Sequence, residues 1–201
     1  MSAKSSYSSP SPVIQQISNE FRRTGWISLW SQVVLVIISS IILIVAATAA
    51  RAPVINPAVP GVVIPAPPNP SAGVGGVLTF GAIAVMGFTI YWAFRYVLIG
   101  RQLRRDAPAR PKKSEVTQLI RTGLLASLSG ILLGILGSFA IIGTVAVIAF
   151  RQGPGFVTGS QTQTVNSLDI LVVQASVNLI LAHFLGLVSS LWLLYRMNRQ
   201  G

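Results

Sequence analysis

The chain has 201 residues, of which 52% are hydrophobic and only 9% are charged. Soluble domains carry about 25% charged residues, so this composition excludes an ordinary soluble globular protein. The 15 Lys and Arg residues outnumber four Asp and Glu residues, giving a net charge of +11. In so apolar a chain, this charge indicates cationic loops that flank membrane helices and argues against nucleic-acid binding. Cysteine does not occur, which excludes disulfides and thiolate chemistry.

The N-terminal tail, residues 1–26, has no apolar core of the kind found in a cleavable secretory signal. Its apolar residues Ile14, Ile17 and Phe21 recur at helical spacing and stand next to two arginines. This pattern predicts a short helix that lies on the cytoplasmic leaflet ahead of the first membrane span.

Four stretches are long and apolar enough to span a bilayer, which requires about 20 residues of helix. They cover residues 27–50, 74–98, 123–150 and 170–195. None of them shows the single polar face of a soluble amphipathic helix. The sequence therefore predicts an all-α integral membrane protein with four transmembrane helices.

The connections between the spans differ in character. Residues 51–73 contain seven prolines, which favour extended polyproline-like chain over helix or sheet. Residues 99–122 form a basic loop, residues 151–169 a second external loop, and residues 196–201 a C-terminal tail.

Basic residues are distributed unevenly among these connections. The N-terminal tail carries three, the loop at 99–122 seven and the C-terminal tail two, whereas the other two loops contain only Arg51 and Arg151. By the positive-inside rule, both termini and the basic loop are cytoplasmic, or stromal in a plastid. The tryptophans stand at the same ends of the spans: Trp26, Trp30, Trp92 and Trp192. We expect the basic loop to contact anionic lipids.

The two halves of the chain share local features. Arg-Thr-Gly opens the first span at 23–25 and the third at 121–123, and the second and fourth spans both end in Trp, Arg and then Arg-Gln. One interpretation is a duplicated helical hairpin, giving two parallel repeats. The other is convergence, because basic and aromatic residues gather at every cytoplasmic helix end.

Small residues follow one face of the third span at spacings of four and three. They are Gly123, Ser127, Gly130, Gly134 and Gly137. Such a face lets helix backbones approach closely in lipid. The pattern predicts a tight helix contact, which we expect within the chain, with another protomer as the alternative.

The fourth span is the most polar. One stripe recurs every seven residues, at Asp169, Ser176, His183 and Ser190. Gln174 and Asn178 lie four residues apart on another side, and we expect them to form interhelical hydrogen bonds.

Two interpretations of His183 stay open, because an intramembrane ionisable residue either packs as a neutral group or lines a transport path. Asp169 lies near the external interface, and a helix separates it from His183 by about 21 Å, so the two cannot share an ion. Their spacing gives no metal site, and we leave a metal unassigned. No catalytic constellation or cofactor motif occurs, so we expect a non-enzymatic protein without a cofactor.

Motifs in the first and fourth spans resemble a known family. They are Phe21-Arg22-Arg23-Thr24-Gly25-Trp26, Leu168-Asp169, the run from Val172 to Ser176, Asn178, and the run from His183 to Val188. They resemble the small four-helix Tic subunit family of the chloroplast inner envelope, also described as a permease in chloroplasts. The resemblance covers about residues 20–195. The chain departs from the plant form because it shows no long transit peptide and has the Pro-rich loop. These differences suggest a cyanobacterial homologue in the plasma or thylakoid membrane.

The resemblance implies a part in protein import across the inner envelope or, alternatively, in iron transport. Three hypotheses follow: a non-enzymatic subunit of a translocation assembly, an iron permease, or a structural membrane protein without transport. Few buried charges and no ligand cluster favour the first. Its partners would be other membrane subunits or a second copy of the chain.

Overall fold

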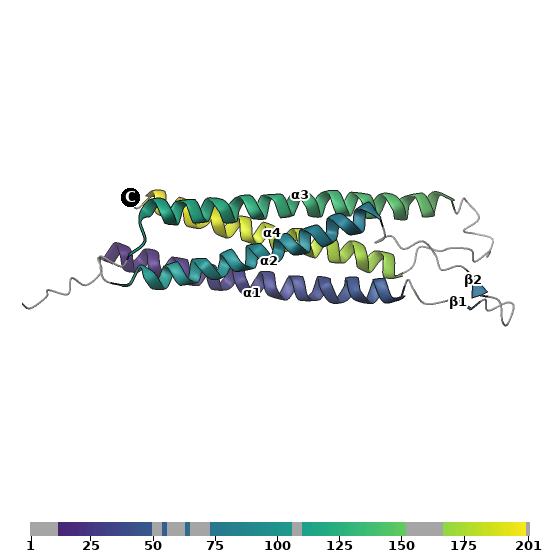
Figure 1. Ribbon diagram of the computed structural model, residues 1–201, viewed down its shortest axis with the longest axis horizontal. Coiled ribbons are helices and arrows are strands. Elements are labelled where there is room, and N and C mark those ends of the chain that lie inside the picture. The colour runs from purple at the N-terminus through teal and green to yellow at the C-terminus, as the bar shows by residue number, and fades with distance from the viewer. Residues whose placement is uncertain are drawn as a thin grey trace, which may run out of the picture. The chain divides into compact units, whose positions relative to one another are not determined.

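The computed structural model describes residues 12–49, 54–55, 63–64, 73–105, 110–151 and 167–199. The elements follow in chain order as α1 (Pro12–Ala49), β1 (Val54–Ile55), β2 (Val63–Ile64), α2 (Val74–Gln102), α3 (Lys113–Arg151) and α4 (Ser167–Arg199) (Figure 1). All four helices are long and apolar enough to cross a membrane. The predicted all-helical class with four candidate membrane spans is confirmed.

The helices α1 and α3 extend beyond the apolar stretches. The sequence predicts a separate surface helix before residue 27, whereas α1 runs without interruption from Pro12 to Ala49. Proline suits the first turn of a helix, and no proline follows in this segment to break it. In the same way α3 begins at Lys113, ten residues before the predicted span and just after Pro111.

Within the Pro-rich connection the structure describes two strands of two residues each. They pair antiparallel, with Val54 opposite Ile64 and Ile55 opposite Val63. The expectation that this loop avoids sheet is therefore wrong at these four positions. All four residues are β-branched, a class enriched in strands, and here they outweigh the neighbouring prolines.

The chain divides into two compact units. The first unit comprises Met1–Val34, Val85–Ser129 and Ala182–Gly201, and the second comprises Leu35–Ala84 and Gly130–Leu181. Each helix contributes one segment to each unit.

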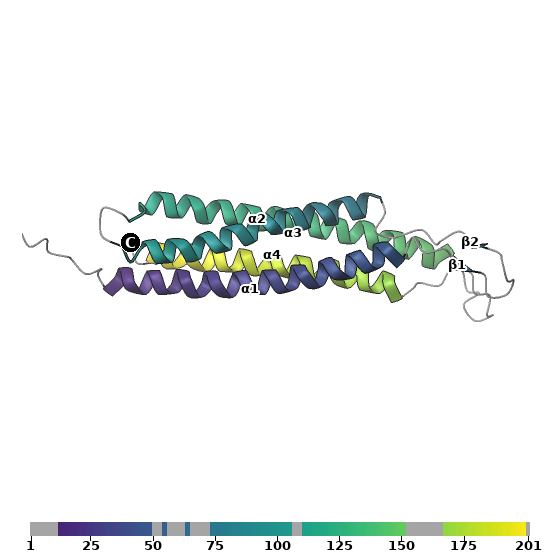
Figure 2. The same cartoon turned by 60° about the horizontal axis from the view of Figure 1, so that its bottom comes forward.

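In the first unit, α1 lies antiparallel to both α2 and α4. Ser18 contacts Gly100 and Gly25 contacts Val97, so positions on α2 fall as those on α1 rise. Figure 2 shows the purple start of α1 beside the yellow end of α4, where Glu20 bonds to an arginine of α4. All four helices supply the apolar core of this unit, made of Phe21, Tyr96, Ile99, Val116, Leu119, Ile120, Leu193 and Met197.

In the second unit, α2 lies antiparallel to α3. The position of a Cβ on Gly75 would lie 2.9 Å from a side-chain carbon of Ile141, and that on Gly137 would lie 2.9 Å from the hydroxyl of Thr79. Residues from α1, α3 and α4 form the core: Leu43, Ala46, Ile141, Val172 and Ala175.

Candidate functional site: the polar seam between the helices

The small residues that the sequence singles out on α3 are all buried: Gly123, Ser127, Gly130, Gly134 and Gly137. In the first unit, a Cβ on Gly123 would overlap the hydroxyl of Tyr96 on α2. In the second unit, a Cβ on Gly134 would lie 2.9 Å from a side-chain carbon of Ile180 on α4. Each unit therefore uses this face for contacts within the chain, with both neighbouring helices.

In the first unit, polar side chains from α1 and α3 meet at a glycine of α4. Gln32 on α1 is 1% exposed, and its amide nitrogen donates to the hydroxyl of Ser28 at 2.8 Å. A Cβ on Gly186 of α4 would lie 2.9 Å from that nitrogen and 2.9 Å from the hydroxyl of Ser127. Gly186 therefore makes room for two polar side chains inside an apolar helix contact.

One turn further along α4, a second polar contact joins α2. The hydroxyls of Tyr96 and Ser190 lie 3.0 Å apart, and both residues are almost fully buried. Tyr96 also covers Gly123 of α3. We call these six residues the polar seam: Ser28, Gln32, Tyr96, Ser127, Gly186 and Ser190.

Most hydroxyls in both units also bond within their own helix. Ser127 donates to the carbonyl of Gly123 at 3.0 Å, and Ser190 donates to that of Gly186 at 2.9 Å. In the second unit, Ser138 does the same toward Gly134 at 2.8 Å. Because a hydroxyl can donate one hydrogen bond and accept others, this local bond leaves its oxygen able to accept from a neighbouring helix.

The structure separates the polar residues predicted on α4. Ser176, His183 and Ser190 are buried, with His183 in the first unit at 0% exposure. Asp169 lies in the first turn of α4, and its side chain is outside the described residues. Among the residues that the structure describes, no three His, Asp or Glu side chains gather closely enough to hold a metal ion.

The expected interhelical hydrogen bonds of Gln174 and Asn178 are not what the structure shows. The Gln174 amide nitrogen donates to the Asn178 side-chain oxygen at 3.0 Å, along the exposed side of α4. Residues four apart in a helix are surface neighbours, so the pair satisfies itself locally. The spacing correctly placed both on one face but did not reveal that this face is exposed.

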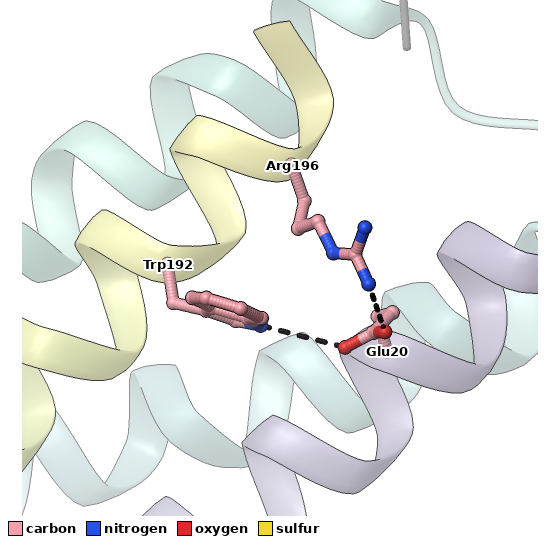
Figure 3. Close-up of polar contacts among 3 residues, drawn as sticks. All are labelled: Glu20, Trp192 and Arg196. Carbon is pink, nitrogen blue, oxygen red and sulfur yellow. Dashed lines mark hydrogen bonds and ion pairs between the residues drawn. The ribbon is translucent and has the colours of Figure 1, made fainter. Parts of the chain in front are cut away.

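A polar cluster ties α1 to α4 near the helix ends of the first unit (Figure 3). Arg196 donates to a Glu20 carboxylate oxygen at 2.7 Å, and the indole nitrogen of Trp192 lies 3.4 Å from the other oxygen. The Arg196 guanidinium also lies 5.4 Å from the centre of the Trp192 ring. Glu20 is the sole acid in the N-terminal tail, and that isolation among basic residues was a signal the sequence offered.

Sequence reasoning missed the seam itself. Ser28 and Gln32 lie four residues apart in the first span, a spacing that places both on one helix face. Nothing in the sequence indicated that Gly186 or Tyr96 would complete the contact, because each depends on which helix lies opposite.

Four long apolar helices, packed through glycine and serine contacts, define a four-span integral membrane protein. The chain belongs to the family described as Protein of unknown function (DUF3611), which matches residues 11–198. It is 30% identical over 187 residues to Protein TIC 21, chloroplastic, of Arabidopsis thaliana. That match covers 90% of this chain and 57% of the relative, so the chain spans little more than half of the relative's length. No solved structure matches.

The resemblance predicted from the motifs is thereby confirmed as distant homology to a chloroplast Tic protein.

Proposed function

We propose that the protein is a non-enzymatic membrane subunit of an assembly that translocates proteins. The observation that carries this proposal is how much of the chain is homologous to the family and to the Tic protein. The family match reaches from the first turn of α1 to the last turn of α4, and the homology to the Tic protein covers 90% of the chain. The family match therefore includes all four helices, and the homology to the Tic protein extends over most of the chain, although the relative is much longer.

The distribution of aromatic and basic residues supports an orientation with both termini on the cytoplasmic or stromal side. All four tryptophans belong to the first unit, which also contains the chain ends and the connection between α2 and α3. Tryptophan is enriched at membrane interfaces. We place the protein in a membrane equivalent to the chloroplast inner envelope, which in a cyanobacterium is the plasma or thylakoid membrane.

The outward side of α3 is the part of the chain that we propose for contact with other subunits or a second copy. With the small residues of α3 used inside each unit, a row of large apolar side chains remains exposed on that helix. The row comprises Leu125, Leu128, Leu132, Leu136 and Phe139. Their spacings of three and four residues place them on one face.

The test is affinity purification of the tagged full chain, in mild detergent, from membranes of its source. A photo-crosslinking residue at Leu128, which is 50% exposed, should give adducts with other membrane proteins and with a precursor arrested during translocation. The same residue at Ile120, which is fully buried, is the matched control and should give no intermolecular adduct.

Purification of the chain alone, without intermolecular adducts, would contradict a role in an assembly. Reconstituted liposomes provide the second arm, because uptake of ferrous iron by the pure chain would support the permease hypothesis instead.

A further inference from the structure

We propose that the first unit binds the phosphate of an anionic lipid headgroup between Arg22 on α1 and Arg104 just after α2. This site is independent of any role in translocation.

Two glycines bring α1 and α2 into close contact. A Cβ on Gly25 would lie 3.2 Å from the carbonyl oxygen of Ala93, and one on Gly100 would lie 2.9 Å from the carbonyl oxygen of Ser18. Both distances are short for a real Cβ, so only glycine permits the approach without a shift. The two backbones therefore lie close together, so that a side chain from either helix can reach the other.

Arg104, which follows α2, forms two hydrogen bonds with α1. Its Nε donates to the hydroxyl of Ser18 at 3.2 Å, and Nη2 donates to the side-chain oxygen of Asn19. Ser18 is itself fully buried and donates to the carbonyl of Gly100. The guanidinium is thus held by a built arrangement of neutral groups, and its charge is not neutralised by them.

Arg22 reaches the same place from α1. A Cβ on Gly100 would lie 2.8 Å from Cγ of Arg22, so the stem of this arginine lies against α2 at that glycine. Arg22 therefore contacts Gly100 and Arg104 contacts Ser18, and the hydrogen bond from Ser18 to Gly100 joins these two neighbours. Two arginines that approach the contact between Ser18 and Gly100 from α1 and from the end of α2 suit phosphate, which accepts several charge-assisted hydrogen bonds at once.

The described residues supply no counter-charge to Arg22 or Arg104. Within the part of the chain that the structure describes, the one ion pair joins Glu20 to Arg196 of α4, so Glu20 is already engaged. Arg22 and Arg104 each form no ion pair with any described carboxylate. Two positive charges that no described carboxylate pairs with favour an anion from outside the chain.

The depth of the site selects a lipid as the source of that anion. Trp26 and Trp30 follow Arg22 at intervals of four residues, so all three share one side of α1. The two indoles are 50% and 55% exposed, with ring centres 5.9 Å apart. Because tryptophan settles at the membrane–water interface, Arg22 stands one turn outside it, at the level of headgroup phosphates.

Native mass spectrometry of the full chain, presented with equal amounts of phosphatidylglycerol and phosphatidylcholine, tests the site. We expect the wild type to retain phosphatidylglycerol selectively. Arg22→Gln should lower that affinity about five-fold, which corresponds to ~1 kcal/mol, the net contribution of one hydrogen bond to the bound phosphate. Arg22→Gln with Arg104→Gln should lower it further. The matched control is Arg121→Gln with Arg199→Gln, which removes two exposed charges of the same unit from α3 and α4 and should change the affinity less than two-fold.

Quenching by brominated lipid tests whether the bound lipid lies beside Trp26 and Trp30. With Trp92 and Trp192 replaced by phenylalanine, brominated phosphatidylglycerol should quench Trp26 and Trp30 more strongly than brominated phosphatidylcholine at the same fraction. The single variant Arg22→Gln leaves the bonds of Arg104 intact, so it keeps the test valid if the double variant fails to fold.

Three results would overturn the proposal. The first is an absence of phosphatidylglycerol preference in the wild type, and the second is an equal loss in the control pair, which would indicate diffuse positive charge. The third is unchanged lipid binding in Arg22→Gln accompanied by loss of a co-purifying protein, which would assign the arginines to a protein partner.

Discussion

Replacement of Gly123 by alanine tests the closest helix contact in the first unit. The added Cβ would overlap the Tyr96 hydroxyl and would lie 3.1 Å from the ring carbon that carries it. Tyr96 is 2% exposed and bonds to Ser190, so its ring has little room to move away. The methyl group must therefore displace either the tyrosine or the helix.

The magnitude follows from two unfavourable terms and one favourable term. Overpacking of a filled interior costs about 1–3 kcal/mol. Loss of the hydrogen bond between Tyr96 and Ser190 adds about 0.6 kcal/mol, the mean for membrane helices. Alanine recovers up to about 1 kcal/mol of helix propensity relative to glycine. We expect the free energy of unfolding to fall by ~1–3 kcal/mol.

The assay is unfolding in mixed micelles of dodecyl maltoside and increasing dodecyl sulfate, followed by circular dichroism. Gly143→Ala is the matched control, because Gly143 lies in the same helix and its Cβ would meet nothing within 4 Å. This control should be neutral or more stable than wild type by up to about 1 kcal/mol.

A double variant isolates the hydroxyl as the cause. In a Tyr96→Phe background the overlapping atom is removed, and the remaining contact with the ring is tight but tolerable. Gly123→Ala should then cost ~1 kcal/mol less than it does alone. Additive effects of the two substitutions, or equal stability of Gly123→Ala and Gly143→Ala, would refute the reasoning.

Three further predictions concern topology, the α1–α4 ion pair and the buried histidine. Single cysteines at Ser5 and Ser114 should react with an impermeant maleimide from one side of the membrane and a cysteine at Ala66 from the other; labelling of the Ser5 and Ala66 positions from one side would contradict the topology. Glu20→Gln should lower the free energy of unfolding by no more than about 1 kcal/mol, because the carboxylate is partly exposed, and a larger loss in the same micelle assay would show a greater role for the ion pair. His183→Gln should reduce stability and complex yield without affecting iron uptake by liposomes, whereas loss of uptake in a stable variant would favour the permease hypothesis.

The helices themselves were predictable from the sequence because lipid leaves the backbone few alternatives. A run of about 20 apolar residues in a bilayer must satisfy its own amide groups, and a helix does so within the segment. The helix ends were not predictable in the same way. The start of α3 at Lys113 is too polar to be read as part of a membrane span, and the helical spacing of Val116, Leu119 and Ile120, which are buried in the first unit, is a helix signal that the predicted span leaves out.

Side-chain spacing revealed faces but not their partners. The spacing of four between Gln174 and Asn178 placed both on one side of α4, yet that side proved exposed and the two residues bond to each other. The small face of α3 was visible as a pattern, but its alternating contacts with α2 and α4 depend on how the helices are arranged. Gly186 is recognisable in the sequence as a small residue of the fourth span, but only the structure shows that Gln32 and Ser127 lie against it.

The local hydrogen bonds of the polar side chains bear on how the chain enters the membrane during synthesis. The Gln32 nitrogen donates to Ser28, the Gln174 nitrogen to Asn178, and the Ser190 hydroxyl to a carbonyl of its own helix, so these donors are satisfied before any neighbour arrives. The Gln32 side-chain oxygen, by contrast, is buried without a hydrogen-bond partner among the described residues. Transfer of a polar group into hydrocarbon costs less free energy when the group is hydrogen-bonded within its own helix than when it has no partner until another helix packs against it. These donors on α1 and α4 therefore need no second helix when their segments enter the bilayer, and the glycine contacts can form afterwards.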